Sequence, residues 1–102
     1  MDATQARDEI DLGDGHRIVF SEYEGEARCG GNVIHPPAEG KCGGQGWISF
    51  EGRAWAKSFD PGQIATWKVE EDVGDRFTIS PSILCRACGD HGFIRDGKWV
   101  RA

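Results

Sequence analysis

Apolar residues occur along the chain in short runs separated by glycine, proline and acidic residues. No window places apolar residues at i, i+3, i+4 and i+7 over several turns, which is the spacing of an amphipathic helix. Fifteen glycines and four prolines break the sequence into short pieces, and both residue types favour turns. The pattern therefore predicts a mainly β protein in which helix is a minor component.

Several segments are rich in β-branched and aromatic residues, the composition typical of strands. We expect single strands at 16–21, 64–69 and 77–80, a hairpin at 47–59 that turns at Glu51-Gly52, and a hairpin at 92–101 that turns at Asp96-Gly97. Asp-Gly is the stronger of the two turn signals because both residues tolerate the positive φ of a type I′ turn.

Residues 24–46 contain seven glycines and the Pro36-Pro37 pair, which predicts a long glycine-rich loop. The expected fold is a small antiparallel β-sheet or meander in one domain over residues 10–102, stapled by a zinc knuckle. Residues 1–9 are expected to form a polar, frayed N-terminus.

The charge of the chain is acidic and unevenly placed. The formal net charge is −5, with −6 carried by residues 1–27 and +2 by residues 85–102. Binding a nucleic-acid backbone needs clustered lysine and arginine, so only the C-terminal end keeps that option open. No stretch approaches the roughly 18 apolar residues of a membrane span, and residues 1–9 lack the features of a signal peptide. We expect a cytoplasmic protein with no membrane partner.

Four cysteines in such a chain indicate metal ligands rather than disulfides, because the cytosol keeps thiols reduced. Cys85-Arg86-Ala87-Cys88-Gly89 has the form of a zinc knuckle, in which two thiolates one tight turn apart reach a single tetrahedral ion. The simplest complete ligand set for a structural Zn²⁺ is Cys29, Cys42, Cys85 and Cys88.

Other arrangements of the cysteines stay open. A set of three cysteines and one histidine would use His91 or His35, and His16 is a further candidate, although its place at the entry to a strand suggests a surface residue. A Cys29–Cys42 disulfide and a redox-active Cys85–Cys88 pair are the non-metal alternatives. The redox alternative is the weaker of the two, because a redox-active C-x-x-C pair normally lies at the N-terminus of a helix in a βαβ unit.

The sequence contains none of the common catalytic motifs. A zinc deaminase signature, H-E-x-x-H, G-x-S-x-G, a Walker loop and G-x-G-x-x-G are all absent. The sequence therefore assigns no catalytic residue and favours a non-enzymatic role. Most tryptophans suit a core, while a contact patch could form at the C-terminal end from Arg86, Arg95, Trp99 and Arg101.

The run from Trp67 to Val100 resembles a family of small uncharacterised domains found in bacteriophage genomes and in some bacterial operons. The residues that carry the resemblance are Trp67, Thr78, Ser80, Pro81, Ser82, Cys88, His91, Phe93, Ile94, Asp96, Gly97 and Lys98. The resemblance implies a metal-binding accessory protein, encoded by a phage or prophage, with no established chemistry. The chain departs from the family pattern in its N-terminal half, where two Cys-Gly-Gly turns lie 13 positions apart in place of a compact C-x-x-C-G.

The leading hypothesis is a zinc-stapled module that acts by protein contact in the host cytoplasm, as an inhibitor of a host or defence factor or as a minor virion component. One alternative is nucleic-acid binding through the basic C-terminal hairpin. The other is a zinc-dependent hydrolase that uses Cys85, Cys88 and His91 with an open fourth position.

Overall fold

The computed structural model of the chain describes residues 8–35, 44–85 and 89–102. All strand pairs in its three sheets are antiparallel, which confirms the mainly β fold class. The elements described are β1 (Glu9–Gly13), β2 (His16–Tyr23), β3 (Glu26–Ile34), β4 (Gln45–Ser49), α1 (Ala54–Lys57), β5 (Lys68–Val73), β6 (Arg76–Ser80), β7 (Ile83–Leu84), β8 (His91–Arg95) and β9 (Lys98–Arg101).

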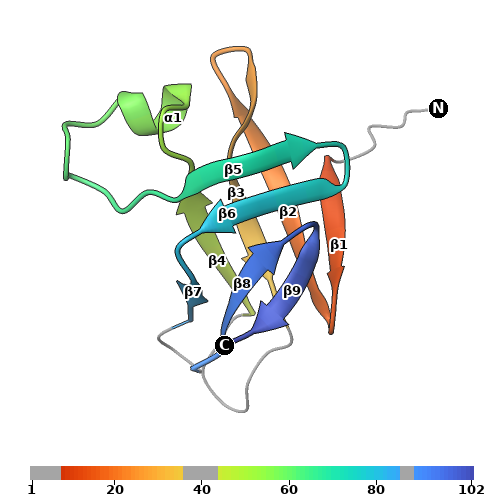
Figure 1. Cartoon of the computed structure of the whole chain (residues 1–102). Coiled ribbons are helices and arrows are strands. Elements are labelled where there is room, and N and C mark those ends of the chain that lie inside the picture. The colour runs from red at the N-terminus through yellow and green to blue at the C-terminus, as the bar shows by residue number, and fades with distance from the viewer. Residues whose placement is uncertain (1–7, 36–43, 86–88) are drawn as a thin grey trace.

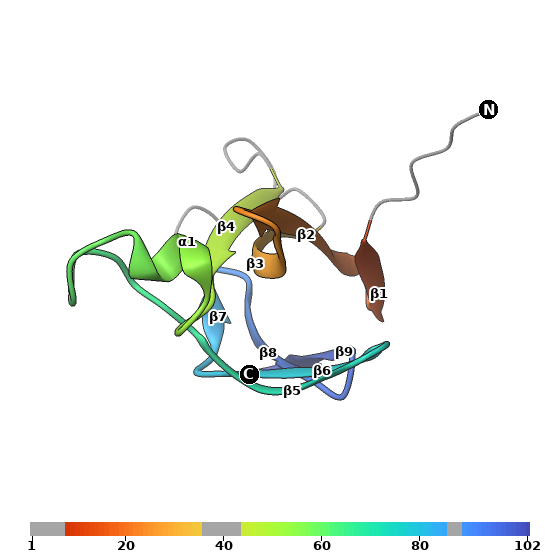
Figure 2. The same ribbon diagram turned by 90° about the horizontal axis from the view of Figure 1, so that it is seen from above.

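The sheets form two layers. Strands β1 to β4 make a four-stranded meander in chain order, while β5–β6 and β7–β8–β9 make two smaller sheets. Strand β6 runs beside β8, which joins the smaller sheets into one layer (Figure 1). Seen from above, the meander curves over the layer that contains β5, β6, β8 and β9 (Figure 2).

Three phenylalanine rings occupy the space between the layers. Phe50 and Phe77 are fully buried, and the Phe20 and Phe77 rings meet edge to face at 4.9 Å between centroids. Arg28 covers this cluster, with its guanidinium 4.2 Å from the Phe20 ring centroid. The same guanidinium pairs with Asp8 at 2.9 Å and with Asp72. Ion pairs to both carboxylates compensate for placing a charged group against the aromatic core.

The predictions with the strongest local signals are confirmed. The strand expected at 16–21 is β2, and the strand expected at 77–80 is most of β6. The hairpin at 92–101 is β8–β9, with positive φ at Asp96 (51°) and Gly97 (72°). Both φ values suit the predicted type I′ turn.

The prediction of a loop over residues 24–46 is wrong where β3 crosses it, at Glu26–Ile34. Gly30 lies inside this strand, and a Cβ there would fall 2.5 Å from the Trp47 indole on β4. The glycine therefore permits a close approach between neighbouring strands rather than a turn. Residues 36–43 of the predicted loop lie outside the described residues.

Two further strand predictions are wrong in part. The hairpin at 47–59 has only its first strand, because residues 54–57 form α1. Trp55 on this helix meets Phe59, just beyond its C-terminal end, with ring centroids at 5.2 Å. The strand expected at 64–69 begins only at Lys68, and Trp67 makes a single parallel bridge to Phe50.

The approach of Trp47 to Gly30 predicts a specific cost for adding a methyl group. We expect Gly30→Ala to lower the free energy of unfolding by about 1–3 kcal/mol, because the new Cβ must displace both the indole and the neighbouring Ile48 backbone. The matched control is Gly46→Ala on β4, where nothing lies within 4 Å of the added Cβ. Its expected change is about 0.5 kcal/mol or less. Urea unfolding of both variants tests this, and equal losses would contradict the packing argument.

Candidate functional site

A serine hydroxyl and a histidine ring meet on the exposed face of the sheet formed by β7, β8 and β9. The distance between His91 Nε2 and Ser82 Oγ is 2.8 Å. Ser82 directly precedes β7, and His91 is the first residue of β8. His91 is exposed and Ser82 is half-buried, so solvent and larger molecules can reach the pair.

The register of β7 and β8 explains why the two side chains meet. Leu84 lies opposite His91, and Ile83 lies opposite Gly92. Side chains alternate between the faces of a sheet, so Ser82 lies on the same face as Leu84 and His91. The other face holds the buried Ile83 and Ile94. Burial of these isoleucines therefore turns the serine and the histidine outward together.

The serine of the pair is anchored by a tryptophan. Trp67 Nε1 donates a hydrogen bond to the backbone carbonyl of Ser82 at 3.2 Å. The Trp67 backbone is itself held, since its N–H donates to the Ser49 carbonyl at 2.9 Å and its carbonyl accepts from Glu51 N at 2.8 Å. The position of Ser82 is therefore fixed relative to the end of β4.

The histidine side is anchored through the preceding residue, Asp90. Its carboxylate lies 2.7 Å from His16 Nε2, and its backbone carbonyl accepts a hydrogen bond from Cys85 N at 2.8 Å. His16 is buried and stacks on Trp99 with ring centroids 4.1 Å apart. The interpretation of His16 as a surface residue is thus wrong, because the ring closes the core beneath the start of β8.

Apolar and basic side chains surround the pair on the same face. Phe93 follows His91 at the next outward position and lies opposite Val100 of β9. Leu84 and Val100 are exposed hydrophobic residues. Beyond them, the Arg95 guanidinium lies 4.3 Å from the Phe93 ring centroid. The surface beside Ser82 is therefore an apolar shelf that ends at a cation.

A serine hydroxyl hydrogen-bonded to an imidazole is the arrangement in which histidine can act as a general base and serine as a nucleophile. Within the described residues, no carboxylate is hydrogen-bonded to His91. The described part of the site is therefore a dyad of Ser82 and His91. The carboxylate of the neighbouring Asp90 contacts the buried His16 instead.

The structure separates the two predicted cysteine ligands that it describes. The Cys29 thiol is buried and donates to the Glu26 carbonyl at 3.3 Å, near the β2–β3 turn. Cys85 lines a different cavity of about 100 Å³ that also contains His35 and Asp90. No group of three or more potential metal ligands occurs among the described residues. Cys42 and Cys88 lie outside them, so the four-cysteine zinc site remains a prediction.

The residues of the predicted contact patch do not share one face. Trp99 is buried in the core, with 8% of its surface exposed. Arg95 is on the outward face, and Arg101 extends to Asp14 at 3.0 Å. Arg86 lies outside the described residues.

The sequence does not predict the pairing of Ser82 with His91. His91 stands out as an alternative metal ligand, also in the zinc-hydrolase alternative, and Ser82 lies within the segment that carries the family resemblance, but neither residue is predicted to be a nucleophile or a general base. The available signal was the occurrence of both residues in that one segment. It was not decisive because the serine lacks the glycines of a G-x-S-x-G elbow.

Comparisons with known proteins bear on the same segment. The model of a family described as bacterial ubiquitination-like system serine protease (BubE) matches residues 39–102. No curated protein and no solved structure matches the chain. The matched range includes both Ser82 and His91. It confirms the bacterial part of the family resemblance and gives no support to a phage or metal-binding family. Among the described residues, no helix has the length and apolar character needed to cross a membrane.

The anchoring of Ser82 by Trp67 predicts a local effect of removing one indole N–H. We expect Trp67→Phe to accelerate hydrogen exchange of the β7 and β8 amides about fivefold, the equivalent of one net hydrogen bond of ~1 kcal/mol. The matched control is Trp47→Phe, which loses the indole N–H bond to Ser49. This control should leave β7 and β8 unchanged. The same exchange rates in both variants would contradict the anchoring role.

Proposed function

The chain belongs to the BubE family of bacterial ubiquitination-like system serine proteases, and from this premise we propose that it is a serine peptidase with Ser82 as nucleophile and His91 as general base. The observation that carries the proposal is the 2.8 Å distance between Ser82 Oγ and His91 Nε2. Among the described serines, Ser82 is the one whose hydroxyl bonds to a histidine. Both residues also lie within the range that matches the family.

The reaction proceeds by acyl transfer. The mechanism requires the His91 tautomer with its proton on Nδ1, so that Nε2 accepts the Ser82 hydroxyl proton as Oγ attacks the carbonyl carbon of a peptide or isopeptide bond. His91 then returns this proton to the departing amine as the C–N bond breaks, which leaves an ester on Ser82. Water, deprotonated by His91, attacks the ester and releases the carboxylic acid, and Ser82 recovers its proton. The dyad and water together account for every proton transfer in these steps.

The residues around the dyad hold Ser82 and His91 in position and take no part in the proton transfers. Trp67 fixes the backbone of the nucleophile, while Asp90, bound to His16, fixes the start of β8. The apolar shelf of Leu84, Phe93 and Val100 suits the side chains of an extended polypeptide. The open face also suits a protein substrate, since a segment of a large molecule can reach it without entering a deep cavity.

One element of the accessory-module hypothesis carries over. Membership in a ubiquitination-like system supports a protein partner, and we propose that the partner is the substrate. Neither the match nor the described structure supports an inhibitor of phage origin, a virion component or a nucleic-acid-binding protein. The zinc hydrolase alternative differs from the proposal in its nucleophile, which would be a metal-bound water rather than Ser82.

A fluorophosphonate probe tests the proposal without knowledge of the natural substrate, because it phosphonylates an activated serine hydroxyl. We expect one phosphonyl group on the peptide that contains Ser82, and none on the Ser82→Ala variant. In His91→Asn the labelling rate should fall by at least about 10³-fold, since an unassisted serine is a weak nucleophile. Mass spectrometry of digested protein gives both results.

The control for this experiment is Ser80→Ala, which removes the other hydroxyl of the Ser80-Pro81-Ser82 segment. Its labelling should match that of the unmodified chain. Labelling that persists in Ser82→Ala, or no labelling of the intact chain, would refute the assignment.

The predicted zinc is retained as a second, separate proposal with a narrower ligand set. Cys85 and His35 line one cavity, while Cys29 makes its contacts near the β2–β3 turn. The described residues thus favour Cys85 and His35 over Cys29 as ligands. The metal would be structural, and its binding could contribute ~10–16 kcal/mol to folding.

Native mass spectrometry of three proteins tests this ligand set. We expect one zinc ion on the unmodified chain and on Cys29→Ser, and loss of zinc with loss of folding in Cys85→Ser. Addition of a chelator to the unmodified chain should reproduce the unfolding. Zinc loss in Cys29→Ser would instead restore the original four-cysteine set, and an unmodified chain without metal would end the zinc proposal.

A further inference from the structure

Two strand edges face one another across a cavity close to the dyad. Among the described residues, β4 is the last strand of its sheet and β7 is the first strand of its own. Figure 2 shows β7 in the layer opposite β4, on the same side of the molecule. The cavity between them has a volume of about 100 Å³, and its walls include Trp47 of β4, Leu84 of β7 and Trp99 of β9. Ser82 directly precedes β7, so the proposed nucleophile lies beside this gap.

The register of β3 and β4 shows which backbone groups of β4 point to the free edge. Phe50 N donates to the Cys29 carbonyl of β3. Neighbouring residues of a strand direct their N–H and C=O groups to opposite sides, so the groups of Ser49 point away from β3. The Ser49 carbonyl agrees with this, since it accepts the Trp67 N–H from outside the sheet. Trp47, two residues earlier, therefore directs its N–H and C=O to the free edge as well.

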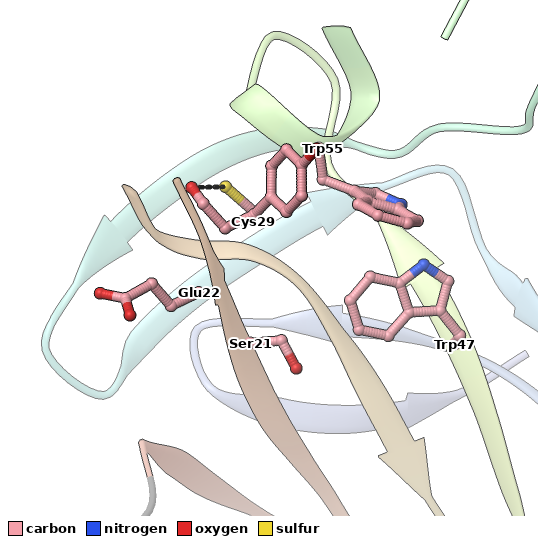
Figure 3. Close-up of a pocket in the computed structure, with 6 residues that line it drawn as sticks. Ser21, Glu22, Cys29, Trp47 and Trp55 are labelled. Carbon is pink, nitrogen blue, oxygen red and sulfur yellow. Dashed lines mark hydrogen bonds between the residues drawn. The ribbon is translucent and has the colours of Figure 1, made fainter. Parts of the chain in front are cut away.

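The side chain of Trp47 fixes the position of this edge. Figure 3 shows its indole beside that of Trp55. Ser49 Oγ accepts hydrogen bonds from the Nε1 atoms of Trp47 and Trp55 at 3.0 Å and 3.1 Å. Gly30 allows the Trp47 indole to lie close against β3. The edge is therefore pre-organised for a partner strand.

The backbone of β7 presents a matching edge from the other side. Cys85 N donates to the Asp90 carbonyl on the β8 side, so the backbone groups of the neighbouring Leu84 point the opposite way. The Ser82 carbonyl also points to this free edge, where it accepts the Trp67 indole N–H. Among the described residues, β8 is the only strand that pairs with β7. The N–H and C=O of Leu84 consequently face the gap without a partner strand.

Trp67 already connects the two edges at one end of the gap. Its backbone N–H bonds to Ser49 beside β4, and its indole N–H bonds to Ser82 beside β7. Beyond Trp67, the edges of Trp47 and Leu84 border the cavity, and no described strand lies between them. The open part of the gap thus continues a connection that Trp67 begins.

A third unpaired group lines the same cavity. Trp99 is 8% exposed, and its Nε1–H has no hydrogen-bond partner. Buried N–H groups are nearly always paired, so one without an acceptor indicates a partner that is yet to bind. A carbonyl oxygen placed in the cavity would supply this acceptor.

We propose that a segment of the protein substrate binds in this gap as an added β-strand, paired through its main chain with Trp47 and Leu84. The inference rests on the proposed peptidase function. An extended chain directs N–H and C=O groups alternately to both sides, which matches one free edge on each side. The narrow cavity excludes a helix, whose diameter with side chains is about 10–12 Å.

The segment is the one on the amino side of the scissile bond. This part of the substrate stays on Ser82 as the ester, so its pairing would hold the acyl group through both steps of the reaction. One of its carbonyls can accept the Trp99 N–H. The proposed zinc ligands His35 and Cys85 lie at the end of the gap away from Trp67, since His35 bonds to Gly44 before β4 and Cys85 follows β7.

Two phosphonate probes test the pairing. Both end in the diphenyl phosphonate of alanine, which reacts with an activated serine hydroxyl and releases phenol. One probe extends this group on its amino side with acetyl-Ala-Ala-Ala, and the other is the same molecule with a methyl group on every amide nitrogen. We expect the unmethylated probe to label Ser82 at least about tenfold faster, as two net hydrogen bonds imply. Equal rates would overturn the proposal.

A simple fluorophosphonate without a peptide separates this result from the peptidase assignment. If it labels Ser82 while the two peptide probes react equally, the added strand alone is refuted. If no probe labels Ser82, the peptidase assignment is refuted and the strand falls with it. On each variant, the rate of the unmethylated peptide probe is therefore divided by the rate of the fluorophosphonate to give a peptide preference.

Substitutions at the gap locate the pairing. Leu84→Pro removes an N–H that points into the gap, and proline is tolerated on an edge strand where its nitrogen faces outward. The peptide preference should fall at least about threefold. Trp99→Phe is an independent second variant, which removes the unpaired N–H without breaking a hydrogen bond and should also lower the preference about threefold. Urea unfolding checks that both variants remain folded.

The matched control is Glu9→Pro on the free edge of β1. The Asp8 carbonyl accepts the Phe20 N–H, so the Glu9 N–H points away from β2 and its loss should leave the peptide preference unchanged. A full preference in folded Leu84→Pro and Trp99→Phe would overturn the assignment of the strand to this gap.

Discussion

The contacts of Trp67 connect the two parts of the molecule on which the site depends. Its backbone continues the edge of the four-stranded sheet through hydrogen bonds with Ser49 and Glu51, and its indole N–H bonds to the Ser82 carbonyl. One residue thus relates the outward-facing serine to the phenylalanine core between the layers. On the other side, Asp90 and His16 relate β8 to the same core. The dyad is exposed, but the contacts that support its backbone on both sides lead to the core, which holds the two side chains on ordered strands.

Local signals were sufficient for parts of the fold in which neighbouring residues determine the conformation. The Asp96-Gly97 turn is one example, since its two positive φ values follow from residue type alone. The glycine pair at 30–31 is the opposite case. In sequence it resembles a turn, whereas in the fold Gly30 makes room for Trp47 from another strand. The short helix α1 was missed for a similar reason, because the contacts of Trp55 with Ser49 and Tyr23 are tertiary.

The site was less accessible to sequence reasoning than the fold. His91 was identified as a residue of interest, but its partner was inferred to be a metal because a C-x-x-C motif stands nearby. The pairing with Ser82 depends on the register of β7 against β8, and β7 is too short to be predicted from periodicity. The cysteines show the same limit, since shared Cys-Gly-Gly motifs suggested a common role for Cys29 and Cys42. The Cys29 thiol is instead directed to backbone carbonyls of its own hairpin.

Strand β7 contains only two residues, yet it sets the alignment of Ser82 with His91. A ladder this short is expected to open at a lower free energy than the sheets that enclose the phenylalanine core. Retention of the folded core and retention of the aligned pair are therefore separable properties of the chain. Mild denaturant or modest heating could separate the hydroxyl from the imidazole while far-UV circular dichroism still reports an intact β protein. For this molecule, a global melting temperature would overstate the range over which the exposed face keeps its working geometry.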